Sequence, residues 1–296
     1  MKIVKIYGGL GNQMFQYAFS RALEKAVGGR EELRYDCSAC DADATHNGLE
    51  LEKVFGLELA RASEDECGRL AVRPTSLVHR FRRKYLTPRS HIIDRKFSYQ
   101  GELLSLVGDY YYEGYWQNEK YFRDFEPEIR KDFSFSRRLD GRNERLFEEL
   151  PRPIASIHVR RGDYLKYPDL DICTEGYYRR AIEEFRKEGS AASFMVFSED
   201  VDYCRQSLGL SEAEATFVDW NAGAASWQDM AMMSRCDAHI IANSSFSWWG
   251  AWLDPKDGKS VIAPEIWNRR QIANRDRYYR FDYGEVVPER WRRRPL

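Results

Sequence analysis

The stretch IASIHVRRGDY at residues 154–164 decides the fold class, because six mostly apolar residues end abruptly in two arginines, a glycine and an aspartate. Ile154–Val159 has the length and apolar character of a buried strand. The pattern repeats downstream as far as residue 263, where apolar strands alternate with short amphipathic helices. This alternation predicts a parallel sheet covered by helices on both faces, which is an α/β fold.

The pattern also divides the chain. After Ile154–Val159 we expect strands at residues 194–197, 216–218, 238–242 and 260–263, and helices at 177–187, 201–208, 227–234 and 246–253. Residues 1–7, 8–13 and 14–27 predict a separate strand, glycine turn and helix, with a further strand at 33–35. Pro151 and Pro153 mark a boundary between domains at residues 1–150 and 151–296. Residues 60–104 have poor periodicity and predict an irregular or helical insertion, with a basic run at 79–84.

Composition and charge limit the class of protein. The 296 residues are 43% hydrophobic and 31% charged, as in a globular protein of one or two domains. Lys and Arg number 46 against 47 Asp and Glu, and a net charge of -1 argues against nucleic acid as a partner. Because the sequence shows neither a signal peptide nor an apolar run of about 18 residues, we expect a cytoplasmic protein that at most rests on a membrane surface.

Ligands of parallel sheets lie at the carboxyl ends of the strands, and this rule selects the loops at residues 8–13, 160–164, 198–200 and 243–247. The guanidinium of Arg160 suits a diphosphate, although an Arg–Asp pair that stabilises the loop is the alternative. Ser244 and Ser245 at a helix start favour phosphate, with an ordinary serine N-cap as the alternative. The glycine turn at 8–13 is either a tight turn or a close approach to a pyrophosphate or sugar.

The sequence predicts no metal site. The Asp-x-Asp matches, Asp41/Asp43, Asp169/Asp171 and Asp200/Asp202, are near the number expected by chance. Cysteines are sparse, which indicates reduced thiols, and the lone CxxC at Cys37 and Cys40 lacks the second pair typical of a zinc site.

Five stretches together resemble the α-1,2-fucosyltransferase family, glycosyltransferase family eleven, including its bacterial members. They are GGLGNQMFQYA at 8–18, YYEGYWQNEKYF at 111–122, HVRRGDY at 158–164, FSED at 197–200 and NSSFSWWGAWL at 243–253. The resemblance implies two Rossmann-like domains of GT-B type with a cleft between them, the N-terminal one on the acceptor side and the C-terminal one binding GDP-fucose. It also implies an inverting, metal-independent galactoside α-1,2-fucosyltransferase, which moves L-fucose from GDP-β-L-fucose to the 2-hydroxyl of a terminal galactose in a glycan. No cofactor is expected, since GDP-fucose is a co-substrate.

The resemblance also assigns residues. Arg160 would bind the diphosphate, His158 the nucleoside, and Asp229 the guanine edge, although Asp229 is alternatively the partner of Ser226 in a helix capping box. The expected donor-binding set is Gly9, Gly11, Asn12, His158, Arg160, Asp200, Asp229, Asn243, Ser244 and Ser245. Tyr115 and Trp116 are the expected acceptor contacts.

For the chemistry, Arg160 would stabilise charge on the departing GDP, and Asp163 is the candidate general base, with a salt bridge to Arg161 as its alternative role. Two other functions compete. One is a transferase of another nucleotide sugar on the same scaffold. The other is a non-catalytic carbohydrate-binding protein with a platform of Tyr110, Tyr111, Tyr112, Tyr115 and Trp116, although aromatic clusters are more often core.

Overall fold

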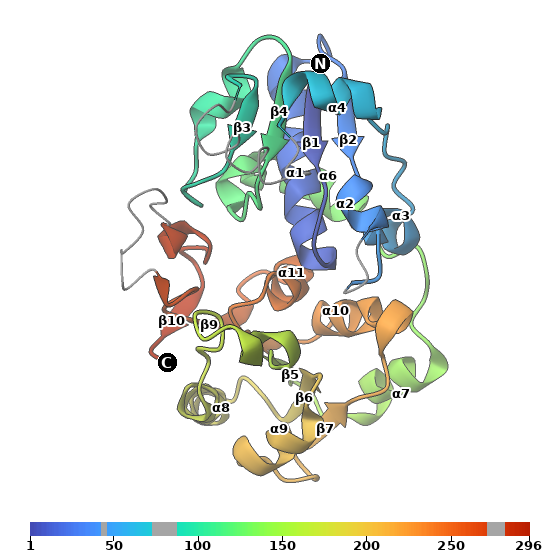
Figure 1. Cartoon of the computed structure of the whole chain (residues 1–296). Helices are drawn as coiled ribbons and strands as arrows, with labels where there is room; N and C mark the ends of the chain where they lie inside the picture. The colour runs from blue at the N-terminus through green and yellow to red at the C-terminus, as the bar shows by residue number, and fades with distance from the viewer. Residues whose placement is uncertain (43–45, 73–87, 271–281) are drawn as a thin grey trace. The chain divides into compact units, whose positions relative to one another are not determined.

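The structure is a computed structural model that describes residues 1–42, 46–72, 88–270 and 282–296. The chain divides into two compact units, Met1–Ser136 and Arg137–Leu296. Each unit contains one sheet whose strands are all parallel (Figure 1). The predicted α/β class is therefore confirmed.

The first unit is built on a four-stranded sheet in the order β2-β1-β4-β3. The strands are β1 (Lys2–Lys5), β2 (Leu33–Asp36), β3 (His91–Ile93) and β4 (Tyr110–Glu113). The helices are α1 (Leu10–Val27), α2 (Ser38–Asp41), α3 (Glu50–Phe55), α4 (Glu64–Leu70) and α6 (Glu126–Asp132), with 3-10 turns η1 (Gly101–Ser105), η2 (Glu119–Tyr121) and η3 (Arg123–Phe125). The aromatic stretch that begins at Tyr110 is thus an inner strand of this sheet, and Tyr111 and Tyr112 are buried.

Helix α1 begins at Leu10, four residues before its predicted start. A tertiary contact stabilises this early start, because the buried Glu50 carboxylate accepts the Leu10 N–H at 3.1 Å and so satisfies one of the first donors of the helix. The helix ends at Gly28, which has φ of +59° and closes it in the left-handed conformation.

Residues 60–104, expected to be an irregular or helical insertion, contain helix α4, strand β3 and the turn η1. The basic run at 79–84 lies outside the described residues, as does Asp43.

The second unit is built on a six-stranded sheet in the order β10-β9-β8-β5-β6-β7. The strands are β5 (Ile154–Val159), β6 (Ser193–Ser198), β7 (Ala215–Val218), β8 (Ala238–Ile240), β9 (Ser260–Pro264) and β10 (Arg292–Arg294). The helices are α7 (Gly141–Glu149), α8 (Glu175–Glu188), α9 (Val201–Ser207), α10 (Trp227–Met233) and α11 (Ser245–Leu253), with 3-10 turns η4 (Gly162–Lys166), η5 (Gly223–Ala225) and η6 (Tyr283–Glu285). The predicted strands and helices of this unit are confirmed to within two residues at each end, whereas β10 and α7 were not predicted.

Side chains of alternate residues enter two cores on opposite faces of this sheet. Ala155 and Ile157 pack with Tyr177 and Phe185 of α8 on one face. Ile154 packs on the other face in a core with Met232 and Met233 of α10. This period of two is the signature of a strand buried on both sides.

The boundary between the units falls between Ser136 and Arg137, ahead of the predicted boundary at 150/151. The reason is α7, whose Leu146 and Phe147 pack on the core that contains Ile154. Asn143 of α7 also hydrogen-bonds to Asn221 in the same unit. The prolines near residue 151 therefore mark the entry to β5 inside the second unit.

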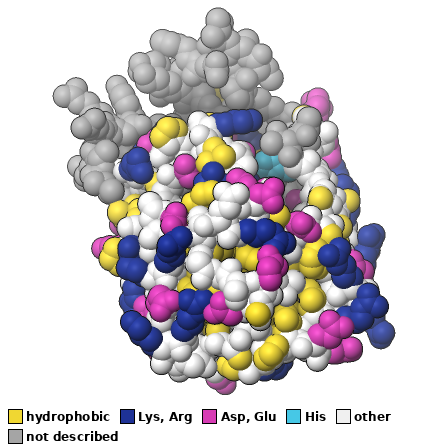
Figure 2. Space-filling model, turned by 90° about the horizontal axis from the view of Figure 1, so that it is seen from below, with side chains coloured by type: hydrophobic (Ala, Val, Ile, Leu, Met, Phe, Trp, Pro, Cys, Tyr) yellow, Lys and Arg dark blue, Asp and Glu magenta, His cyan; other side chains and the backbone are white. Residues whose placement is uncertain are grey.

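Acidic and basic side chains are interspersed over the face shown in Figure 2, as expected from the nearly balanced charge. In the part of the chain that the structure describes, no helix combines the length and the apolar character needed to cross a bilayer.

Candidate active site

Three of the four predicted loops lie at one edge of the second sheet. Strand β5 lies between β8 and β6, so the loops that follow these parallel strands emerge side by side. Tyr164 of the first loop donates its hydroxyl to the Asn243 carbonyl at 3.3 Å, and Arg161 pairs with Asp200. The structure therefore brings these loops together, and their role in binding a ligand stays a prediction.

The Arg160 side chain is held between two carboxylates. Its Nη2 donates to Asp163 Oδ1 at 2.6 Å, and its Nη1 donates to Glu199 Oε1. Its Nε is buried and has no hydrogen-bond partner among the described residues. Because buried N–H groups normally have an acceptor, this Nε is suited to an oxygen of a bound anion. Asp163 thus pairs with Arg160 and not with Arg161, which was its expected alternative partner.

Glu199 lies in the FSED stretch that the sequence analysis selected, but it was not in the expected donor-binding set. It contacts Arg160 from the loop after β6, whereas its neighbour Asp200, the predicted ligand residue, faces Arg161. Asp200 Oδ2 accepts from Arg161 Nε at 3.0 Å, and its Oδ1 caps α9 through the Tyr203 N–H at 3.1 Å. The Arg161 guanidinium lies 3.6 Å from the Tyr203 ring centroid. These contacts give Arg161 and Asp200 a role in fixing the loop.

His158, the penultimate residue of β5, is buried beside Arg160. Its ring centroid lies 5.8 Å from that of Phe246, and its Nδ1 has no partner among the described residues. Burial, assisted by the positive charge of Arg160, lowers the pKa of His158 to about 3. The imidazole is therefore neutral at physiological pH and offers one donor and one acceptor but no charge.

The loop before α11 combines a tethered asparagine with two serines. The Asn243 side-chain amide donates to the carbonyls of Leu170 and Trp267 at 2.9 and 3.0 Å. Ser244 is the N-cap of α11, and its hydroxyl accepts the Phe246 N–H at 3.3 Å. The hydroxyl of Ser244 thus serves the cap, whereas the first-turn N–H groups and Ser245 lie where a helix attracts an anion.

Asp229 lies in the first turn of α10, close to Glu199. Asn221 Nδ2 donates to its Oδ1 at 2.8 Å. Burial raises the pKa of Asp229 to about 7, the negative charge of Glu199 adds to the rise, and the bond from Asn221 opposes it. Ser226, the N-cap of α10, makes no side-chain capping bond, so the capping box considered from the sequence is not formed.

In the first unit, the predicted glycine turn joins β1 to α1. Gln13 Nε2 donates to the carbonyls of Gly8 and Gly48 at 2.7 and 2.8 Å, which holds the turn closed. A Cβ on Gly9 would lie 2.7 Å from the His46 side chain, so a larger residue there would displace that ring. Asn12, in the first turn of α1, accepts from Gln117 Nε2 at 2.9 Å. Gly9, Gly11 and Asn12 therefore gather at the helix start, next to the stretch that follows β4.

The two predicted acceptor residues have different surroundings. Trp116 is 1% exposed and stacks on Phe19, with ring centroids 4.1 Å apart at 7°. Tyr115 is half-buried, with its ring centroid 4.9 Å from that of Tyr7. Trp116, whose φ is +54°, therefore packs in the core, and Tyr115 is the residue of the pair with an accessible surface.

Comparison with known proteins decides the family. The family described as Glycosyl transferase family 11 matches residues 84–284. An alpha-1,2-colitosyltransferase of Escherichia coli is 31% identical over 303 residues, which cover 98% of this chain and 97% of that protein. The chain belongs to glycosyl transferase family 11.

Two further matches of this glycosyltransferase have lower sequence identity. Human galactoside alpha-(1,2)-fucosyltransferase 1 is 27% identical over 145 residues, which cover 45% of the chain and 40% of the human protein. The solved structure of NodZ alpha-1,6-fucosyltransferase from Bradyrhizobium, soaked with GDP-fucose, matches with a TM-score of 0.53 and 17% identity over 90% of this chain and 94% of that one. This likeness shows the fold, so the predicted GT-B-type architecture of the glycosyltransferase is confirmed. The family resemblance is confirmed by the family match and the colitosyltransferase.

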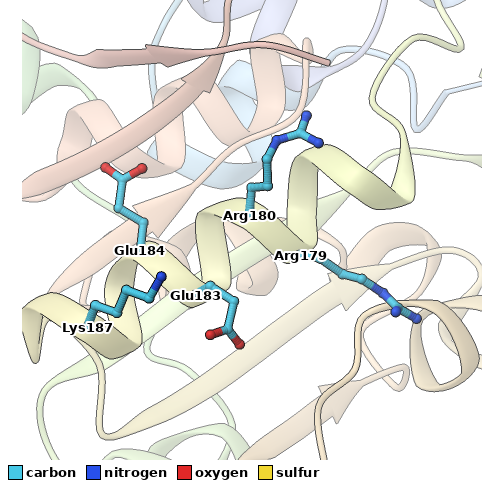
Figure 3. A pocket seen from close by; sticks show the side chains of 5 residues that line it. All are labelled: Arg179, Arg180, Glu183, Glu184 and Lys187. Carbon is cyan, nitrogen blue, oxygen red and sulfur yellow. The ribbon is translucent and has the colours of Figure 1, made fainter.

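A hollow on the surface of the glycosyltransferase lies over α8 and is separate from these loops. Arg179, Arg180, Glu183, Glu184 and Lys187 line it (Figure 3). Arg179 is engaged by Glu175, and Glu184 by Arg292 and Arg294 of β10. None of the predicted site residues reaches this hollow, so it is not a candidate for the transfer site.

The candidate metal ligands and the cysteine pair have other surroundings than a metal or redox site requires. Among residues 1–42, 46–72, 88–270 and 282–296 of the glycosyltransferase, no three His, Cys, Asp or Glu side chains are grouped as ligands for a metal ion. Asp169 pairs with Arg270 at 2.8 Å. Burial raises the pKa of the Cys37 thiol to about 12, which makes it a poor nucleophile.

One further cluster of the glycosyltransferase combines serine, histidine and aspartate. Ser156 Oγ lies 2.8 Å from His239 Nδ1, and His239 Nε2 lies 3.1 Å from Asp254 Oδ2. The His239 and Asp254 side chains have no exposed surface, and burial lowers the pKa of His239. The cluster connects β5, β8 and the end of α11 inside the core.

Proposed function

We propose that this glycosyltransferase moves L-fucose from GDP-β-L-fucose to the 2-hydroxyl of a terminal galactose in a glycan, with inversion at the anomeric carbon. Two relatives whose names specify α-1,2 transfer support the linkage, one of them along 98% of the chain. The shared fold with a fucosyltransferase soaked with GDP-fucose supports a GDP-sugar as the donor.

The observation that carries this proposal is the unpartnered Nε of Arg160 at the end of β5, beside the start of α11. Departure of GDP places negative charge on the β-phosphate. A guanidinium and a helix N-terminus can stabilise that charge without a cation, because both are oriented before the reaction begins. Transfer without a metal or another cofactor is therefore part of the proposal.

Asp163 is proposed as the general base. Its Oδ1 is bonded to Arg160, and its Oδ2 receives no hydrogen bond from the residues that the structure describes. Asp163 would share the Arg160 guanidinium with a bound diphosphate, which Arg160 reaches through its unpartnered Nε. It would then accept the proton of the acceptor hydroxyl as that oxygen attacks the anomeric carbon.

The identity of the donor sugar has a second candidate. The relative that matches 98% of the chain is named a colitosyltransferase. Colitose is fucose without its 3-hydroxyl, so a site that hydrogen-bonds this hydroxyl strongly prefers fucose, and a site without such a partner accepts both.

The test uses the full chain with GDP-fucose, GDP-colitose, a UDP-sugar and an ADP-sugar, each with a panel of galactosides. We expect GDP release that depends on the galactoside, and NMR of the product should show an α-linked sugar on its 2-oxygen. A 2-deoxygalactoside is the matched control. With it, GDP should be released no faster than by hydrolysis of the donor in the absence of any acceptor. Turnover of a UDP- or ADP-sugar alone would establish the other donor class. Sugar binding with no nucleotide released from any donor would establish a carbohydrate-binding protein.

A further inference from the structure

A chain of buried amides ends on the Asp229 carboxylate. The indole Nε1 of Trp220 donates to Asn143 Oδ1 at 2.7 Å, and Asn143 Nδ2 donates to Asn221 Oδ1 at 2.9 Å. Asn221 Nδ2 then donates to Asp229 Oδ1 at 2.8 Å. Asn143 is fully buried and Asn221 is 6% exposed, so bulk water does not replace these bonds.

The indole fixes the orientation of both amides, between which Asn221 Nδ2 also donates to Asn143 Oδ1 at 3.5 Å. A tryptophan N–H can only donate, so it must face the oxygen of the Asn143 amide. The Asn143 NH₂ group then faces Asn221, and the Asn221 NH₂ group must face Asp229. Gln228 reinforces the same orientation, since its Oε1 accepts from Asn143 Nδ2 at 2.9 Å and from the Asp140 N–H at 2.8 Å.

We infer that Asn221, oriented by Asn143 and Trp220, is a positioning residue that holds the Asp229 carboxylate ready to bind the base of the nucleotide donor. The inference deepens the proposed function and rests on it. The donated bond occupies Oδ1, and no described residue donates to Oδ2. The carboxylate is thus fixed in rotation, with its remaining acceptor positions available to paired N–H donors such as those on the edge of guanine.

The same bond favours the ionised form of the carboxylate. Burial raises the pKa of Asp229 to about 7, the charge of Glu199 raises it further, and the donation from Asn221 is the contribution that lowers it. The other charged side chains on adjoining elements are engaged elsewhere, since Arg142 lies over the Trp220 ring and Asp140 caps α7. A protonated Asp229 would lose an acceptor position, so the amide chain and binding of the base are coupled.

The experiment measures GDP binding by calorimetry across a pH series, with the full chain. For the natural sequence, GDP affinity should fall as the pH decreases through the pKa of Asp229. Asn221→Leu removes the donor and keeps the branched shape, so at neutral pH GDP should bind about tenfold more weakly, and the midpoint of the pH profile should rise by about one unit. Trp220→Phe removes the N–H that orients the chain and keeps an aromatic ring under Arg142, and it should shift the midpoint in the same direction by less.

The matched control is Ser193→Ala, which removes a buried hydrogen bond of 2.7 Å to the Pro151 carbonyl at the opposite end of β6. It should lower the melting temperature without moving the pH midpoint. An unchanged midpoint in both Asn221→Leu and Trp220→Phe would overturn the inference, and Trp220→Phe alone carries the test if Asn221→Leu does not fold. Asp229→Asn distinguishes a failure of the positioning role of Asn221 from a failure of the proposed function. If it weakens GDP binding while the amide variants do not, only the positioning role fails, and if the natural protein does not bind GDP, the proposed function fails too.

Discussion

Arg160 and Asp163 are joined by a bond of 2.6 Å between Nη2 and Oδ1, across a single turn at the end of β5. The proposed stabiliser of the leaving group is therefore also the counter-ion of the proposed base. Substitutions at the two positions should not be additive, because each residue sets the charge environment of the other.

Arg160→Lys should lose most of its transfer activity and remain folded. An ammonium cannot bridge two oxygens as a guanidinium does, and the loss of one charged hydrogen bond, about 1.5–3 kcal/mol, corresponds to at least roughly tenfold in kcat/KM. Steady-state kinetics beside a melting curve provide the measurement. Arg152→Lys is the control, because Arg152 pairs with Asp237 at the other end of β5. Activity of Arg160→Lys within about threefold of the natural protein would remove Arg160 from the site.

Asp163→Asn should reduce kcat by about 100-fold or more, with little change in the KM for the donor, because it removes a proton acceptor and keeps the shape. The loss should be smaller for an acceptor whose hydroxyl is more acidic. A kcat near that of the natural protein would show that another group or water accepts the proton.

Transfer should persist in EDTA. The positive charge near the diphosphate is expected to come from Arg160 and the start of α11, so chelation removes nothing that the reaction uses. GDP release is measured after dialysis against the chelator and again after addition of Mg²⁺ or Mn²⁺. Loss of activity that either ion restores would refute metal independence.

Asp229→Asn should change nucleotide selectivity and stability in opposite directions. Without a carboxylate, preference for GDP over ADP as an inhibitor should fall by about tenfold. Burial raises the pKa of Asp229 from its ordinary value of 3.8 to about 7, so the aspartate stabilises the fold below about pH 4 and loses that contribution as the pH rises through 7. The variant should therefore melt a few degrees higher than the natural protein at about pH 8. A lower melting temperature with unchanged GDP binding would give Asp229 a purely structural role.

Tyr115→Ala and Trp116→Ala should separate acceptor binding from packing. Trp116 is buried against Phe19, so its truncation should cost about 3–5 kcal/mol of unfolding free energy. Tyr115→Ala should raise the KM for the galactoside with a smaller loss of stability. Equal effects of the two substitutions on both quantities would show that Tyr115 is also only a core residue.

The second unit was largely predictable because strands buried on both faces give short apolar runs, as at Ile154–Val159, which was placed to the residue. β10 was missed because its three arginines carry no apolar signal. They join the sheet through pairing with β9, and Arg292 and Arg294 bind Glu184 from α8. Contacts between segments far apart in sequence decided this strand, and no local pattern reports them.

In the candidate site, too, local patterns were predictable and contacts between distant segments were not. The motifs indicated which loops to consider, but Arg160 pairs with Glu199 from a loop 39 residues away. Which of two neighbouring carboxylates faces which arginine depends on side-chain direction at the end of β6. The amide chain that reaches Asp229 could not be seen either, because Asn143 lies in a charged helix that looked like the end of the first domain.

The buried cluster of Ser156, His239 and Asp254 has the connectivity of a hydrolase triad, with the serine on one imidazole nitrogen and the carboxylate on the other. No acyl group could reach it, because His239 and Asp254 have no exposed surface. A search for catalytic geometry by distances alone would therefore assign esterase or protease activity to this chain, and access of solvent is the criterion that rejects it.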